Sequence, residues 1–201
     1  MTSPTAIVDG RRARRDRGMN QVLDAMIDLF TQGNLDPTPE QVAALAGVSG
    51  RTVYRYFEDS TALMHAAIDR HFERISPLTV IPQLGAGTLD ERIARLVSAR
   101  VRLFDAVASA YRAASAKAPT DPILADRLDF TRGAMREQVE MQFSNELDAL
   151  DPSVRATRAA GIELLVAFES VDGLRSIRGL SSRATQAILT DALGALLGAD
   201  S

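Results

Sequence analysis

Cysteine is absent from this chain of 201 residues. Disulfide bonds, zinc sites built from thiolates and cysteine nucleophiles are therefore excluded. Long apolar segments are also missing: none approaches the roughly 20 residues of a membrane-spanning helix, and the arginine-rich N-terminus is not followed by the apolar segment of a signal peptide. We therefore expect a soluble protein of the cytoplasm.

The residue patterns of enzymes and metal sites are missing as well. The two histidines, His65 and His71, are six positions apart and do not share a helix face as zinc-binding pairs do. His65 and Asp69 could together ligate a metal, but such a spacing more often marks a surface helix pair. We find no paired carboxylates with histidine, no nucleophile with its base and no phosphate loop. We expect no catalytic activity, no metal and no cofactor.

Strand patterns are also lacking, because no run alternates β-branched or aromatic residues with polar ones. Apolar residues instead recur at the three-residue and four-residue spacings of amphipathic helices. Hydrophobic residues make up 46% of the chain and charged residues 24%, which is ordinary for a globular protein. The sequence therefore predicts an all-α fold.

Several segments carry the signals that begin a helix. Residues 38–41 (TPEQ) and 88–91 (TLDE) both read as capping boxes, in which the threonine and the residue three positions later satisfy each other's backbone N–H. Asp121-Pro122 and Asp151-Pro152 each place a capping aspartate before a proline, and we expect these pairs to open helices of about 28 and 25 residues. A first helix should follow the arginine-rich segment, and a last one should span about 182–197.

Positive charge is concentrated at the N-terminus. Residues 11–17 contain five arginines and one aspartate, a local charge of +4 in a chain whose net charge is −3, so the remainder carries −7. Such a run is either a solvated tail or a nucleic-acid contact. Within residues 1–17, which we treat as a basic arm, Arg14, Arg15 and Arg17 are candidates to contact DNA.

Residues 38–57 (TPEQVAALAGVSGRTVYRYF) read as two short helices joined by a tight turn. Ala43 is small where the helices should cross, and Gly47 stands where the turn needs a positive φ, which glycine adopts without steric cost. The second helix of such a pair is narrow enough to enter the major groove of DNA. Two ordinary amphipathic helices are the alternative, but they rarely expose so many basic and aromatic side chains.

The outward face of the second helix suits DNA. Arginine can bridge guanine O6 and N7, threonine can bind phosphate or touch a thymine methyl group, and tyrosine hydroxyls reach phosphate oxygens. Hydroxyl groups at the helix N-termini can add phosphate contacts. The predicted contact residues are Thr38, Ser49, Arg51, Thr52, Tyr54, Arg55 and Tyr56.

Residues 46–57 (AGVSGRTVYRYF) and 58–68 (EDSTALMHAAI) resemble the TetR family of repressors. The close resemblance covers about residues 17–75, and the segment 164–180 is similar more loosely. The resemblance implies about nine helices: a three-helix DNA-binding domain at 18–58 and a larger helical domain at 59–201 that dimerises and binds a ligand. It also implies that Gly50 faces DNA and that Phe57 packs inward. Ser60 stands where many members have lysine, which weakens the expectation of a charged phosphate contact there.

The resemblance further implies a homodimer on a palindromic DNA site. Apolar and small residues recur at helical spacing in the two C-terminal helices, and they either fill a core or pair across a twofold axis. The candidate interface residues are Gly161, Leu164, Leu165, Phe168, Ile188, Ala192, Leu193 and Leu196.

The sequence gives fewer signals for an effector site than for the DNA-binding segment. Five residues could line a pocket or simply fill a core: Phe104, Tyr111, Phe130, Met135 and Phe168. Because these side chains are apolar or aromatic, we expect a mostly apolar or aromatic effector. The sequence predicts a repressor that such a molecule releases from DNA, and the alternatives are a helical dimeric interaction module or a DNA binder without an effector.

Overall fold

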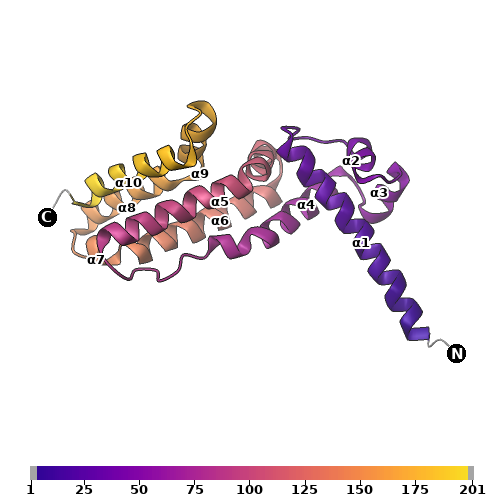
Figure 1. The fold of residues 1–201 in the computed structure, drawn as a ribbon, viewed down its shortest axis with the longest axis horizontal. Helices are drawn as coiled ribbons and strands as arrows, with labels where there is room; N and C mark the ends of the chain where they lie inside the picture. Colours follow the sequence, from indigo (N-terminus) through magenta and orange to yellow (C-terminus); the bar gives the residue numbers. More distant parts are fainter. Residues whose placement is uncertain (1–3, 199–201) are drawn as a thin grey trace. The chain divides into compact units, whose positions relative to one another are not determined.

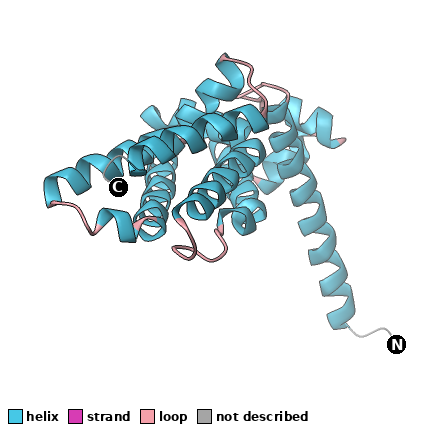
Figure 2. Cartoon of the chain, turned by 60° about the vertical axis from the view of Figure 1, so that its left-hand side comes forward, coloured by secondary structure: helices cyan, strands magenta, loops and turns pink. Residues whose placement is uncertain are grey.

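The computed structural model describes the backbone of residues 4–198 and the side chains of residues 12–198. Throughout this range the regular structure is helical, without strands (Figure 2). Ten α-helices are present in the described chain, two of them single turns, where about nine were expected (Figure 1). The prediction of an all-α fold is confirmed. Within the same residues no helix combines the length and the apolar character that crossing a membrane requires.

The chain forms two compact units. The first, which we call the head, contains the residues up to Arg74 together with Ser109–Ala125. The second, the body, contains Ile75–Ala108 and the residues from Asp126 onward. These units are not the three functional segments expected from the sequence, whose bounds stay a prediction.

Four helices of the head follow one another at the N-terminus: α1 (Pro4–Thr31), α2 (Pro39–Ala46), α3 (Gly50–Tyr56) and α4 (Ser60–Ile75). Helix α1 packs on α2 and α3 through its C-terminal half, while its N-terminal half extends beyond them (Figure 1). The expectation that the first helix begins after the basic arm is wrong, because α1 is continuous from Pro4 through the arginines.

A small core holds the head together. Val22, Met26 and Phe30 lie at helical spacing on α1 and are almost fully buried, as are Leu63 and Ile68 on α4. Burying such side chains contributes about 1.5–3 kcal/mol each. Polar side chains also connect α1 and α4: Arg70 of α4 donates two hydrogen bonds to the carboxylate of Asp24 on α1, at 2.9 and 3.0 Å.

The end of α5 (Leu89–Lys117) and the start of α6 (Pro122–Gln142) complete the head. His65 of α4 is hydrogen-bonded to Asp121 at 2.6 Å, and Lys117 pairs with Asp36 at 2.7 Å. Asp121 also accepts hydrogen bonds from the backbone N–H groups of Ile123 and Leu124, so its predicted capping role is confirmed. These contacts tie the turn between α5 and α6 to the head.

The body is a bundle of α5, α6, α8 (Pro152–Val166) and α10 (Ser182–Gly198), with the short helices α7 (Ser144–Leu147) and α9 (Phe168–Asp172) between them. Its core is apolar, with Ile93, Leu96, Phe143, Ile162 and Leu189 among its most buried members. The capping box at the start of α5 is confirmed, because Glu91 accepts from the Thr88 N–H and donates its own N–H to the Thr88 hydroxyl.

Two predicted helices are shorter than expected. Helix α6 ends at Gln142 after 21 residues, because Phe143 leaves helical geometry and is fully buried in the body core. Helix α8 ends at Val166 after 15 residues, because Ala167 is extended. Asp151 makes no side-chain cap hydrogen bond, so its predicted capping role is wrong, although Pro152 does begin α8.

The break at Ala167 serves packing. It turns the Phe168 ring onto Phe104 of α5, with ring centroids 4.9 Å apart, and buries Val171 in the body core. The chain then passes through a π-helical turn at Gly173–Ile177 before α10. Neither proline nor glycine marks the break at Ala167, so the sequence predicted one continuous helix.

Candidate nucleic-acid interface

The start of α2 is fixed by its own residues. The Thr38 hydroxyl accepts the Gln41 N–H at 3.3 Å, and the Gln41 side chain accepts the Thr38 N–H at 2.9 Å. The predicted capping box is therefore confirmed. A hydroxyl that accepts one hydrogen bond retains its own hydrogen, so Thr38, which is exposed, can still donate to a phosphate oxygen.

The turn between α2 and α3 depends on Gly47, whose φ is +65°. In this left-handed conformation its N–H reaches the carbonyl oxygens of Ala43 and Ala44, which closes α2. The side chain of Gln21 on α1 donates to the Ala46 carbonyl at 2.9 Å and satisfies another free acceptor at the same helix end. The turn is therefore held from within the pair and from α1.

Helix α3 is anchored on one side and open on the other. Ser49 caps it by accepting the Thr52 N–H at 3.2 Å, and the two hydroxyls lie 2.9 Å apart. Val53 is buried against the rest of the head, and Phe57, just after α3, is buried as the resemblance implied. Leu45 of α2 is exposed.

The outward face of α3 presents Arg51, Tyr54 and Arg55, which are all exposed. Neither Arg51 nor Tyr54 has a hydrogen-bond or ion-pair partner among the described residues. Arg55 stacks over the Tyr56 ring at 5.2 Å and donates to its hydroxyl at 3.4 Å. Gly50 and Thr52 are half-buried at the start of the helix. A cationic and aromatic surface without carboxylate partners in the described chain is suited to a polyanion.

Tyr56 is held against α1. A Cβ atom added at Gly18 would lie 2.6 Å from the Tyr56 hydroxyl, so the glycine makes room for this side chain. Tyr56 is half-buried, which leaves less of its ring for DNA than an exposed tyrosine has. The sequence offered no signal for this contact, because Gly18 stands inside a helix and nothing local requires a glycine there.

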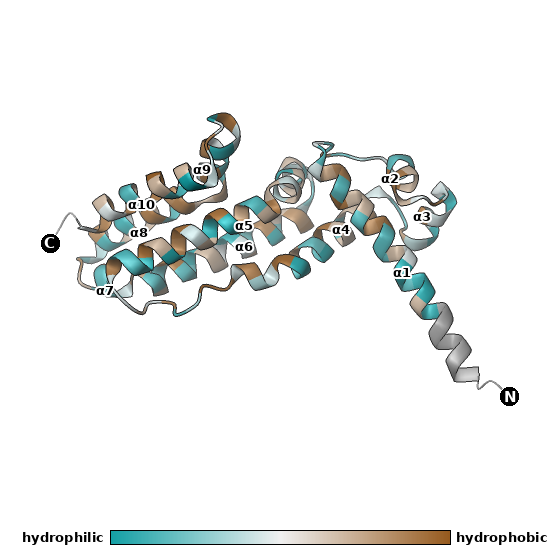
Figure 3. Cartoon of the chain, in the orientation of Figure 1, coloured by the Kyte–Doolittle hydropathy of each residue, from teal (hydrophilic) through white to brown (hydrophobic). Residues whose placement is uncertain are grey.

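The basic arm is part of α1. Arg12, Arg14, Arg15 and Arg17 are all exposed on the helix, and Arg14 and Arg17 share a face because they are three positions apart. Figure 3 shows this stretch as hydrophilic. Arg11 lies outside the residues whose side chains are described. Arg17 lies near the end of α2, because Arg17, Leu45 and Ala46 line the same hollow.

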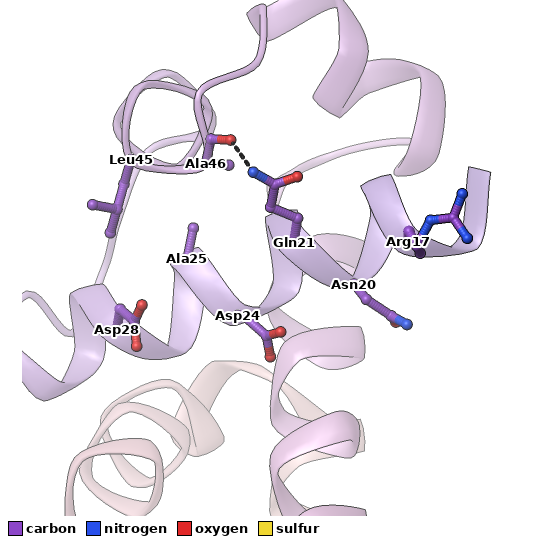
Figure 4. A pocket seen from close by; sticks show the side chains of 8 residues that line it. All are labelled: Arg17, Asn20, Gln21, Asp24, Ala25, Asp28, Leu45 and Ala46. Atoms are coloured by element: carbon purple, nitrogen blue, oxygen red, sulfur yellow. Dashed lines mark hydrogen bonds between the residues drawn. The ribbon is translucent and has the colours of Figure 1, made fainter. Parts of the chain in front are cut away.

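A hollow lies between α1 and α2 (Figure 4). Its lining is mixed: Arg17, Asn20, Gln21, Asp24, Ala25, Asp28, Leu45 and Ala46. The carboxylate of Asp24 belongs to the ion pair with Arg70, and hydrogen bonding by Arg70 holds the pKa of Asp24 below its ordinary range. Because two carboxylates line this hollow, it is poorly suited to phosphate.

The candidate effector residues are not gathered in one place. Phe104 and Phe168 are in contact within the body, whereas Tyr111 belongs to the head. Met135 is half-buried on α6. The Phe130 side chain is 80% exposed, so in the single chain it lines no enclosed pocket. Sequence periodicity could not separate these places, since both faces of α6 carry apolar residues.

The candidate dimer residues differ in how deeply they are buried. Leu193 is fully buried in the core of its own chain, and Gly161 allows α8 and α10 to approach, since an added Cβ would lie 3.3 Å from Leu196. Leu165, Phe168, Ala192 and Leu196 are partly buried. Leu164, on α8, is 69% exposed, and Ile188, on α10, is also exposed.

Comparisons with known proteins identify the fold. No family model matches the chain, and no curated protein matches it. Solved structures do: a TetR-family transcriptional regulator from Streptomyces coelicolor has 23% identity and a TM-score of 0.68, over 92% of this chain and 82% of that one.

Two further solved structures are similar. One is described as a TetR-family transcriptional regulator from Rhodococcus sp., with 19% identity and a TM-score of 0.63 over 90% of this chain and 99% of that one. The other is described as a fatty acid metabolism regulator from Clostridium perfringens, with 17% identity and a TM-score of 0.55 over 89% and 97%. This chain has the fold of the TetR-family regulators, as the resemblance implied.

Proposed function

We propose that this protein is a sequence-specific DNA-binding transcriptional regulator. The observation that carries the proposal is the outward face of α3, where Arg51 and Tyr54 are exposed without protein partners in the described chain. The helix itself is held in place by its cap residues, by the turn before it and by the buried Val53. Arg51 reads a base, while Thr38, Ser49, Tyr56 and the arm arginines contact phosphates. Such a protein acts in the cytoplasm and needs no catalytic site or cofactor.

The regulator acts as a homodimer. Leu164 on α8 and Ile188 on α10 are large apolar side chains that water would otherwise contact, and the fold is shared with the TetR-family structures. Two copies related by a twofold axis bring two α3 helices to a palindromic operator, in which successive major grooves are about 34–36 Å apart along the duplex. Seated on a promoter, the dimer represses by blocking polymerase.

A small molecule bound in the body releases the dimer from DNA. Helices α5 and α6 each belong partly to the body and partly to the head, and His65–Asp121 and Lys117–Asp36 fix their connecting turn to α4 and to the segment before α2. A change in α5 or α6 therefore shifts the head. The effector needs only to favour a state in which the two α3 helices no longer match successive major grooves.

A gel-shift titration on the DNA flanking the protein's own gene tests the proposal. The wild-type dimer should bind one fragment at a salt and competitor concentration at which Tyr54→Ala and Arg51→Ala bind weakly. Arg183→Ala is the matched control, because it removes an exposed arginine from the start of α10 in the body.

Two results favour the alternatives. If the protein forms a dimer but retards no fragment beyond random DNA, a helical interaction module is the better interpretation. If it binds a fragment with specificity and no compound that stabilises the body alters that affinity, the protein is a DNA binder without an effector.

A further inference from the structure

Two arginines of α5 are buried in the body, and only one of them has a counter-ion among the described residues. Arg92 donates to both carboxylate oxygens of Glu146, to Oε2 at 2.6 Å, and also to the Gln142 carbonyl at 2.9 Å. Its guanidinium lies 6.0 Å from the Phe143 ring centroid. Hydrogen bonding by Glu146 raises the pKa of Arg92. This charge is balanced inside the protein.

Arg100, eight positions later, is 5% exposed and has no carboxylate partner within the described part of the chain. One Nη donates to the Gln138 Oε1 at 2.7 Å and the other to the Met135 carbonyl at 3.1 Å, which are both neutral acceptors. The Nε–H is buried without any partner there. An unbalanced buried charge is costly, and proteins seldom retain one without a use for it.

The guanidinium remains charged in spite of its burial. Desolvation lowers the pKa of Arg100 to about 10, which still leaves the group protonated at neutral pH. The Gln138 side chain accepts a hydrogen bond from Arg100 but is neutral, so it does not balance the charge. Its orientation is fixed, because its Nε2 donates to the Thr79 carbonyl at 2.8 Å and its oxygen therefore faces Arg100. Arg100 is thus a buried cation whose Nε–H has no partner and whose two Nη groups each retain a second N–H.

Aromatic side chains lie one helical turn from Arg100 in the body. Phe104 is four positions further along the same face of α5, and its ring centroid is 4.9 Å from that of Phe168, with the two rings tilted by 41°. A ligand with its anionic end at Arg100 would therefore place the remainder of the molecule among aromatic side chains. A single guanidinium balances a monoanion, whereas a phosphate dianion would leave one negative charge buried.

We propose that Arg100 binds the carboxylate of an apolar monocarboxylic acid, which is the effector of this regulator. The carboxylate accepts the free Nε–H and an Nη–H in the bidentate geometry that guanidinium groups favour. The apolar part contacts Phe104 and Phe168. The effector role rests on the proposed function, while the binding site does not.

Thermal unfolding of the full-length protein tests the site. Sodium octanoate at about a hundred times its Kd should raise the Tm of the wild type by about 5 °C or more, while octanamide, of the same shape but neutral, should not. Arg100→Met should unfold at the wild-type Tm or above it, because an unbalanced charge is gone, and should lose the response to octanoate. Phenylbutyrate and decanoate extend the panel to other apolar acids.

Arg92→Met is the matched control, since it removes the other buried arginine of α5. It should lower the Tm, because Glu146 is left without its partner, but should retain a response to octanoate. If that variant does not fold, Arg100→Lys takes its place. Lysine keeps the positive charge but lacks the bidentate geometry of the guanidinium group, so octanoate should raise the Tm of this variant only slightly.

Three results would overturn the site: no shift with any acid of the panel, an equal shift with octanamide, or an Arg100→Met variant that is destabilised but still responds. Calorimetric binding and gel shift then separate the two proposals. Octanoate that binds through Arg100 should weaken operator binding at least about fivefold. Binding without that loss overturns the effector role, whereas a protein that binds octanoate but no DNA contradicts the proposed function and leaves the site standing.

Discussion

Helix α3 of the head and helices α8 and α10 of the body leave different side chains on their surfaces. On α3 the exposed residues are cationic or aromatic with a hydroxyl, such as Arg51 and Tyr54. On α8 and α10 they include Leu164 and Ile188, and Figure 3 shows apolar residues along both helices. Exposed charged groups can form ion pairs with a charged ligand. Exposed leucine and isoleucine side chains are stabilised only when another apolar surface covers them and removes them from water.

The proposed function gives the head and the body different partners. It places DNA on a surface that the head does not use for its own folding, so changes there should reduce binding and leave stability intact. It places a second copy of the chain on exposed residues of α8 and α10, next to residues of the same helices that are buried in the body core.

The largest effect should come from Leu164→Arg or Ile188→Arg. Either change places a charge in the proposed apolar interface, and the monomer should stay folded because both side chains are exposed. Loss of the second head should lower operator affinity about 100-fold or more. Sedimentation gives the oligomeric state, and circular dichroism gives the fold.

Two further variants sharpen that test. Ile177→Arg adds the same charge to an exposed apolar position outside α8 and α10, and should remain dimeric. Leu193→Arg should unfold the body, because this side chain is fully buried in its own chain. A Leu164→Arg protein that still sediments as a dimer would move the interface away from these helices.

Arg51→Ala should have the next largest effect. If Arg51 bridges a guanine, its removal costs about 1–3 kcal/mol on the operator and much less on random DNA. The melting temperature should not change, because the side chain has no partner within the described protein. Fluorescence anisotropy with both DNAs measures the difference, and equal decreases in affinity for the two would assign Arg51 to phosphate binding.

The arm should act through charge alone. Replacing Arg14, Arg15 and Arg17 with glutamine should weaken binding to all sequences and reduce the slope of log K against log salt by about 0.9 for each phosphate that is no longer neutralised. The arginines are exposed on α1, so its stability should change little. The double variant Arg178→Gln and Arg183→Gln, in the body, is the control. An unchanged slope would show that the arm arginines neutralise no phosphates.

The sequence predicted the head better than the body because the signals of the head are local. The capping box at Thr38, the positive φ of Gly47 and the cap at Ser49 each depend on residues within four positions of one another. The ion pair of Asp24 with Arg70 joins positions 46 apart, and no local pattern marks it. The long α1 was missed since its N-terminal half has no apolar stripe.

In the body the wrong predictions have two causes. The chain leaves helical geometry at Phe143, which is buried, and at Ala167, after which Phe168 contacts Phe104, so tertiary packing overrides helix propensity there. Periodicity also marks apolar residues without saying which neighbour covers them. It therefore placed Leu193 and Leu164 in one interface, although one is buried within the chain and the other is exposed.

Gly18 and Tyr56 should show how closely the head couples stability to DNA binding. Alanine in the helix interior is more favourable than glycine by about 1 kcal/mol, but here its Cβ would meet the Tyr56 hydroxyl. Gly18→Ala alone should gain less than this and should weaken DNA binding by displacing Tyr56. In a Tyr56→Phe background it should give the full gain. Urea unfolding of the four proteins measures the coupling, and strict additivity would show that the two residues do not touch.

The smallest effect should be the acid sensitivity of the contact between α1 and α4. Hydrogen bonding by Arg70 holds the pKa of Asp24 below its ordinary value of about 3.9, against the opposing effect of burial. A carboxyl whose pKa is lowered by folding stabilises the native state above the unfolded-state value and loses that contribution as the pH falls through the folded-state value. Because the Asp24 side chain is 42% exposed, the contribution should stay below about 1 kcal/mol.

The measurement is the Tm of wild type and Asp24→Asn between pH 7 and pH 2. The wild type should be the more stable protein above about pH 5, and the difference should shrink below about pH 4. Asp28→Asn, at an exposed carboxylate one turn further along α1, is the control and should have a smaller effect at neutral pH. A difference that stays constant down to pH 2 would mean that Asp24 acts by packing and not by charge. Operator binding should be unaffected at neutral pH, since Asp24 faces α4 and the DNA-facing surface of α3 remains in place.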